Sequence, residues 1–193
     1  MRGKFFASLY DRVLEWSSHR HAPRYLAGLS FMESSFFPIP PDVMLIPMAL
    51  RRPDMAHRFA LLTTVASVIG GLFGYGIGFF AHATLEPWLQ TTHYWDSYQR
   101  AVQWFGQWGF WVVLIAGFSP IPYKVFTVAA GALTVALIPF ILASAIGRGA
   151  RFFLVAQLVA VFGPRIEPMI RRHVEWLGWA TVVAAVGAYL LLR

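Results

Sequence analysis

The chain has 193 residues, of which 58% are hydrophobic and only 13% are charged, against about 45–50% and about 25% in ordinary soluble domains. One core of this size could not hide so much apolar surface from water, and the net charge of +7 comes from Lys and Arg residues scattered between apolar runs, without a basic stripe. The composition therefore excludes a cytosolic enzyme, a disordered chain and a nucleic-acid-binding domain, and it predicts an all-α integral membrane protein.

The first half of the chain contains one long span and one interrupted apolar stretch. Residues 1–24 mix apolar and charged residues at near-helical spacing, which is typical of an amphipathic interfacial helix and fits an ordinary solvated helix equally well. Residues 25–50 are apolar but broken by prolines, which oppose a straight helix. After a charged loop at 51–58, residues 59–83 are free of charge and long enough to cross the roughly 30 Å of a bilayer.

The second half follows the same order. Residues 84–108 are polar and aromatic and predict an interfacial helix. Residues 109–137 form a second proline-broken apolar stretch, and two further spans are expected at 138–163 and 174–192, separated by the basic segment 164–173.

An internal repeat links the two interrupted stretches. Pro-Ile-Pro-Pro-Asp-Val at 38–43 matches Pro-Ile-Pro-Tyr-Lys-Val at 120–125. Interrupted hydrophobic segments at corresponding positions indicate an inverted repeat with a binding site at its interface. We therefore expect residues 25–193 to form one membrane domain, and the turns of its two hairpins to lie at Pro38, Pro40, Pro120 and Pro122.

The distribution of Lys and Arg favours hairpins that enter the membrane and turn back. If both stretches are re-entrant, the basic residues of the N-terminal segment, of 51–58 and of 164–173 all share one side, which leaves only Arg100 and Arg193 opposite. If the first stretch crosses, this bias largely disappears. The positive-inside rule then predicts a cytoplasmic N-terminus.

Charged residues inside these stretches are the candidate site. Glu33 and Asp42 lie on opposite arms of the first hairpin, where a carboxylate is costly unless it is protonated, paired or hydrated. They are either a pair that couples to protons or cations, with Ser34 and Ser35 beside it, or structural partners of Lys124 or an arginine. Lys124 occupies the repeat position of Asp42, so opposite charges would meet if the hairpins pack turn to turn.

Two arginines lie deep in the span 138–163. Arg148 and Arg151 are three residues apart and share a helix face, and arginine is a natural bidentate ligand of phosphate. They either bind a lipid phosphate, together with Lys124, or pair with Glu33 or Asp42, and the two roles are compatible. The six His residues are dispersed and Cys is absent, so we expect no metal site and no cofactor.

Four ordered motifs resemble the DedA family, also called the VTT or SNARE-associated Golgi protein superfamily, and most closely its YqaA-type branch. They are Phe-Met-Glu-Ser-Ser-Phe-Phe-Pro-Ile-Pro-Pro-Asp at 31–42, the glycine-rich run 70–78, Phe-Ser-Pro-Ile-Pro-Tyr-Lys-Val-Phe at 118–126 and Gly-Arg-Gly-Ala-Arg-Phe at 147–152. The resemblance implies a bacterial inner-membrane protein with two re-entrant hairpins. It also implies a flippase or scramblase of phospholipids or polyprenyl phosphates, with its membrane acids at Glu33 and Asp42 and its essential arginines at Arg148 and Arg151.

We accordingly expect a multi-pass lipid transporter that has membrane lipids as partners, does not bind nucleic acid and has no catalytic residues. Coupling to protons and the oligomeric state are left open by the residues. So are two alternatives: a proton-coupled exporter of small cations, which would use the same acids, and a non-catalytic protein of envelope homeostasis.

Overall fold

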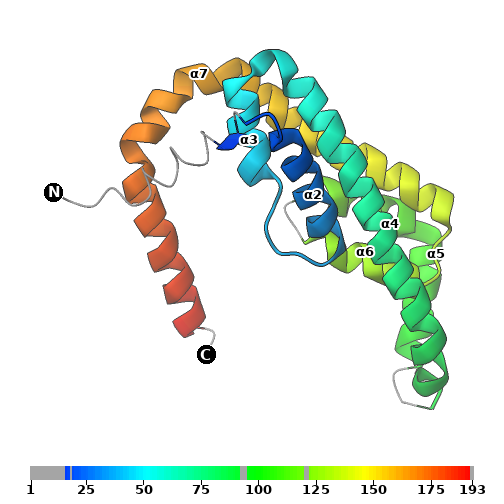
Figure 1. Ribbon diagram of the computed structural model, residues 1–193. Helices are drawn as coiled ribbons and strands as arrows, with labels where there is room; N and C mark the ends of the chain where they lie inside the picture. Colours follow the sequence, from blue (N-terminus) through cyan, green and yellow to red (C-terminus); the bar gives the residue numbers. More distant parts are fainter. Residues whose placement is uncertain (1–15, 18, 92–94, 120–121, 192–193) are drawn as a thin grey trace.

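The computed structural model describes residues 16–17, 19–91, 95–119 and 122–191, and their side chains except at 83, 85, 88, 89, 97, 164 and 166–191. Most of the predicted amphipathic helix and one predicted hairpin proline, Pro120, lie outside the described residues. Within them all regular structure is helical, as expected (Figure 1). The elements are α2 (Ala22–Ser35), α3 (Asp42–Arg51), a short 3-10 helix η1 (Pro53–Met55), α4 (Ala56–Leu89), α5 (Trp95–Phe118), α6 (Tyr123–Ala132) and α7 (Leu137–Leu191).

Each half of the chain has a helical hairpin followed by a long helix, and the short second helix of each hairpin packs on the long helix of the other half. The hairpin α2–α3 precedes the long helix α4, and the hairpin α5–α6 precedes the long helix α7. In each half the first helix of the hairpin packs on its own long helix, α2 on α4 and α5 on α7. The short second helices instead pack across, α6 on α4 and α3 on α7. The interface between the halves therefore includes residues from both hairpins.

Glycines allow the closest of these approaches. A Cβ at Gly70 of α4 would collide with the carbonyl oxygen of Phe31 in α2, and a Cβ at Gly147 of α7 would collide with that of Leu114 in α5. In the cross-packed pair α4–α6, a Cβ at Gly78 or Gly131 would meet the facing backbone in the same way. Small residues that bring helix backbones together are typical of membrane helices.

Three helices in the described part of the chain are long and apolar enough to cross a membrane: Pro53–His82, Tyr98–Phe118 and Leu137–Gly163. The first and third agree with the spans predicted at 59–83 and 138–163. The short helices α3 and α6 have ten residues each, which at 1.5 Å per residue cover about 15 Å, half of the hydrocarbon thickness.

Three predicted boundaries differ in the structure. We expected an interfacial helix to begin at 84, but α4 continues to Leu89. We expected that helix to end at 108 and a hairpin arm to start at 109, but α5 continues through both positions, since none of its residues interrupts the hydrogen bonds of a helix. We also expected a break at 164–173 before the span 174–192, yet α7 is helical throughout. Its ribbon changes direction in its C-terminal half (Figure 1), where Pro164 and Pro168 lack an amide hydrogen and favour a bend.

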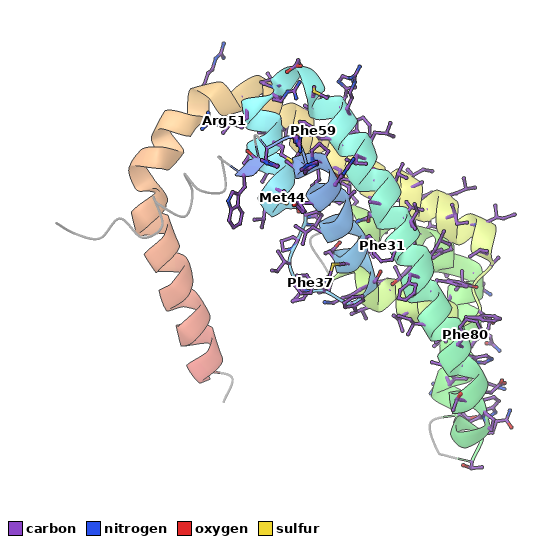
Figure 2. All side chains as sticks on the ribbon, in the orientation of Figure 1. Phe31, Phe37, Met44, Arg51, Phe59 and Phe80 are labelled. Carbon is purple, nitrogen blue, oxygen red and sulfur yellow. The ribbon has the colours of Figure 1, made fainter. Side chains whose placement is uncertain are left out.

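The burial pattern is that of a protein surrounded by lipid. Large apolar side chains cover the outside, and Phe80 near the C-terminal end of α4 is 76% exposed (Figure 2). Arg148, by contrast, is completely buried, together with several Ser and Thr residues. Polar groups thus gather inside the helix bundle, where they can bond to one another, while apolar side chains face outward.

Candidate functional site

Two acids of the first hairpin face two arginines of α7. Glu33 lies near the C-terminal end of α2, and Asp42 is the first residue of α3, on the other side of the turn. Nη2 of Arg148 donates to Oε2 of Glu33, and Nη2 of Arg151 donates to Oδ2 of Asp42 at 2.5 Å. The pairing that we considered as the structural role of these charges is therefore present, and it ties both arms of the hairpin to α7. We call these four residues with Ser34 and Ser67 the charged network.

Arg148 contacts polar and aromatic groups of three other helices. Its Nε donates to Oγ of Ser67 at 2.7 Å, and Nη2 also reaches Oγ of Ser34 at 3.4 Å. The guanidinium carbon lies 4.9 Å from the ring centre of Tyr123 and 4.6 Å from that of Phe152. Buried charges are tolerated when paired and hydrogen-bonded, and aromatic faces add cation–π attraction. The arginine is thus placed between α2, α4, α6 and its own helix.

The second pair is more open. The side chains of Arg151 and Asp42 are 20% and 17% exposed, whereas that of Arg148 is 0% exposed. Nη1 of Arg151 reaches the carbonyl oxygen of Ser119 at 3.5 Å, directly after the end of α5. Arg151 therefore joins the first hairpin to the turn of the second, at the accessible edge of the network.

Two buried atoms of the network have unused hydrogen-bonding capacity. Oδ1 of Asp42 and Nη1 of Arg148 are inaccessible and bond to no group among the described residues. Each buried polar atom of this kind is expected to find a partner. One is an acceptor on a carboxylate and the other a donor on a guanidinium, so each has the capacity for one further hydrogen bond.

Of the two partners left open for Asp42, Lys124 or an arginine, the structure has the arginine. Asp42 pairs with Arg151 rather than with the lysine at the equivalent repeat position. Nζ of Lys124 instead donates to the backbone carbonyl of Phe36 at 3.5 Å, in the turn of the first hairpin. Lys124 of α6 thus contacts the backbone that follows α2, and it does not pair with Asp42 because α3 packs on α7 and carries Asp42 toward the arginines.

The three predicted turn prolines among the described residues lie next to the short helices of the hairpins. Pro38 and Pro40 are exposed in the segment between α2 and α3. Pro122 stands just before the first residue of α6, where proline does not interrupt helical hydrogen bonds. Ser34 belongs to the charged network, whereas Oγ of Ser35 donates to the carbonyl oxygens of Phe31 and Gly70 and so serves helix packing.

The sequence did not predict that four further residues contact the two arginines: Ser67, Ser119, Tyr123 and Phe152. A signal for Ser67 exists, since Ala-Ser-Val-Ile-Gly-Gly at 66–71 repeats as Ala-Ser-Ala-Ile-Gly-Arg at 143–148. In the first copy the serine bonds to Arg148, and in the second Ser144 accepts a hydrogen bond from the Tyr123 hydroxyl. Arg148 replaces the glycine of the first copy, which makes the two halves chemically different at matching positions.

Comparison with known proteins agrees with this architecture. The VTT domain matches residues 39–161. An uncharacterised protein of Haemophilus influenzae is 50% identical over 190 residues, covering 98% of this chain and 99% of its own. An uncharacterised homologue from Histophilus somni is 45% identical over 190 residues, covering 98% and 100%. No solved structure matches the chain. The domain match covers more than half of the chain, including Asp42, Arg148 and Arg151, and this chain therefore belongs to the VTT domain family, the family of the DedA proteins.

Proposed function

We propose that this protein moves a phosphate-bearing lipid, a phospholipid or a polyprenyl phosphate, between the leaflets of a bacterial inner membrane. The observation that carries the proposal is the charged network, in which two arginines and two acids lie inside a helix bundle whose outer surface is largely apolar. A phosphate offers a guanidinium the same paired oxygens as a carboxylate. It can therefore replace Glu33 or Asp42 at its arginine without leaving the arginine unpaired.

The open pair is the natural point of entry. Arg151 and Asp42 are partly accessible, and Arg148 lies one helical turn away with an unpartnered Nη1. A headgroup phosphate would bind Arg151 first and displace Asp42, and it would then reach Arg148. The displaced acids must become protonated or hydrated at this depth, which would couple lipid movement to protons.

The proposed topology is that of two re-entrant hairpins related by an inverted repeat. Support comes from the ten-residue helices α3 and α6, too short to cross, and from their exchanged packing on α7 and α4. The exposed basic residues Arg51, Arg52 and Arg58 lie at the end of α3, directly after it and in the first turn of α4, which favours a cytoplasmic position for this connection and for the N-terminus.

The test is a lipid-movement assay in vesicles. Purified protein is reconstituted into liposomes that contain a fluorescent phospholipid, and the fraction accessible to a membrane-impermeant quencher is followed with time. Wild-type protein should expose the inner-leaflet lipid faster than empty vesicles do. Glu33→Gln and Arg151→Gln should slow this exposure by about tenfold or more, while Arg58→Gln, a change at an exposed position outside the network, should match wild type.

Equal rates for wild-type protein and empty vesicles, with both a phospholipid and a polyprenyl-phosphate probe, would refute the proposal. To control for variants that fail to fold, the thermal unfolding temperature of each variant is compared with that of wild type in detergent before reconstitution.

A proton-coupled exporter of small cations would use the same acids. Both acids are bonded to arginines, so each must lose its partner before it can hold a cation. Substrate-dependent proton flux without lipid movement in the same vesicles would assign this function instead. A non-catalytic role in envelope homeostasis predicts that Glu33→Gln lowers protein abundance while any lipid movement per molecule stays unchanged.

A further inference from the structure

The two halves of the chain meet along two interfaces that differ in their chemistry. One lies between α3 and α7 and the other between α4 and α6, and each joins the short helix of one hairpin to the long helix of the other half. We call the first the polar seam and the second the glycine seam. The two seams occupy corresponding positions in the repeat, so the contacts within each decide which of them opens more easily.

The long helices differ at matching positions of the repeat. Residues 66–74 of α4 align with residues 143–151 of α7 without a gap, and both segments begin with Ala-Ser. In this alignment Gly71 corresponds to Arg148, and Gly74 corresponds to Arg151. One long helix therefore carries glycine where the other carries arginine.

Close packing holds the glycine seam together. A Cβ at Gly74 of α4 would collide with the hydroxyl of Thr127 in α6, and a Cβ at Gly78 or Gly131 would collide with the backbone of the facing helix. The Tyr75 hydroxyl also donates to the carbonyl oxygen of Val135, directly beyond the turn after α6, at 2.6 Å. Backbones this close cannot be parted by rotating a side chain, so separation of α6 from α4 would forfeit the packing of several turns at once.

Side chains hold the polar seam together. The short helix α3 contains no glycine, and its first residue, Asp42, pairs with Arg151 of α7 at 2.5 Å. Both side chains are partly exposed, and an ion pair that water reaches is weaker than a buried one. Leu45 and Met48 of α3 also pack in one apolar cluster with Phe152 of α7, but lipid tails can replace such contacts in a membrane.

Apolar side chains accompany the ion pair on both helices. Ile46 lies four residues after Asp42, and Leu154 lies three residues after Arg151, so each shares a helix face with the charge that precedes it. Ile46 is 40% exposed and Leu154 is 50% exposed. In the described part of the chain, no ion pair joins α4 to α6. The polar seam thus combines charges for a headgroup with apolar surface for acyl chains.

We propose that the lipid passes along the polar seam, and that α3 separates from α7 to admit it while α6 stays on α4. This inference rests on the lipid movement proposed above and names its path. A headgroup phosphate can bind Arg151 only where Asp42 has left it, so the phosphate stabilises the separated arrangement. Without a phosphate the ion pair re-forms and the seam closes.

Spin labels at exposed positions measure the opening of each seam. The chain contains no Cys, so two introduced cysteines are the only labelled sites. Ile46→Cys with Leu154→Cys reports on the polar seam, and Ile77→Cys with Val125→Cys reports on the glycine seam, at side chains that are all exposed. Each doubly labelled protein, in a maltoside detergent, is titrated with a short-chain phosphatidic acid or with the diacylglycerol of the same chains, which lacks the phosphate. Electron paramagnetic resonance gives the distance between the labels.

The distance between α3 and α7 should increase by several ångström with phosphatidic acid and stay unchanged with diacylglycerol. The pair on α4 and α6 is the matched control and should keep its distance with either lipid. Asp42→Asn removes one charge of the ion pair, so it should broaden the distribution of α3–α7 distances before any lipid is added. The thermal unfolding temperature of each labelled protein checks that the labels leave the fold intact.

Separation of α4 from α6, equal changes at both seams, or an unchanged α3–α7 distance with phosphatidic acid would overturn the inference. The distances are measured without lipid movement, so they are independent of the vesicle assay. Opening of the polar seam without lipid movement in vesicles would refute transport but keep the seam as a phosphate-controlled gate. Lipid movement with a polar seam that stays closed would keep transport and refute this path.

Discussion

Oγ of Ser67 in α4 accepts a hydrogen bond from Nε of Arg148 in α7 at 2.7 Å. The same oxygen lies 2.7 Å from Oγ of Ser34 in α2. One hydroxyl thus connects the first hairpin, the long helix of its own half and the arginine of the other half. Hydrogen bonds to charged groups contribute more to the free energy of unfolding than those between neutral groups. We therefore expect the loss of this contact to destabilise the fold strongly.

Ser67→Ala should destabilise the protein by about 2 kcal/mol, because it leaves a buried guanidinium nitrogen without a partner. The measurement is the free energy of unfolding in detergent, from denaturant titration. Ser30→Ala is the matched control. Its hydroxyl donates only to the neutral carbonyl of Thr63, and its loss should cost about 1 kcal/mol. Equal losses for the two variants would contradict the role given to Ser67.

The two ion pairs should differ in coupling energy. A double-mutant cycle with Glu33→Gln and Arg148→Gln should give about 2–3 kcal/mol, the upper range for residues in one network. The corresponding cycle with Asp42→Asn and Arg151→Gln should give about 1 kcal/mol, since both of those side chains are partly exposed and water screens their attraction. A larger coupling energy for Asp42–Arg151 than for Glu33–Arg148 would contradict this prediction.

Gly70→Ala should separate α2 from α4. The added methyl group would strike the carbonyl oxygen of Phe31, and backbone cannot yield without moving a helix, so a loss of about 1–3 kcal/mol is expected. Gly76→Ala is the control in the same helix, because nothing lies within 4 Å of the added carbon. It should be neutral or stabilise the protein by up to about 1 kcal/mol. Thermal unfolding of both variants in detergent would show the contrast.

Thr134→Gly should stabilise the protein. Thr134 follows α6 at the left-handed position of a Schellman motif, where Val135 N–H donates to Ala130 and Thr134 N–H donates to Gly131. Relief of left-handed strain is worth about 1–2 kcal/mol, and the greater freedom of glycine in the unfolded chain offsets about 0.5–1 kcal/mol of it. A net gain of about 1 kcal/mol should appear as a higher unfolding temperature, and a lower one would show that the threonine side chain is required by the fold.

Local chemistry explains which features could be anticipated. Prolines interrupt helices through their own ring, so the turns near Pro38 and Pro122 were predictable from the residues alone. The helix boundary predicted at 108–109 was wrong because no residue there interrupts a helix. The helix α5 runs past residue 108 because aromatic and Gln residues suit a helix as well as they suit an interface, and composition cannot distinguish the two.

The amino-acid sequence by itself determined that this chain is a helical membrane protein with charges in its apolar stretches, because the cost of placing apolar surface in water and charge in lipid depends only on residue type. Only the tertiary structure decided that Arg148 pairs with Glu33, that Arg151 rather than Lys124 pairs with Asp42, and that Ser67 completes the network. Those partners are far apart in the chain. Which of several opposite charges meet depends on how α3 and α7 pack, and that is set by the glycine contacts and side-chain shapes of the whole bundle.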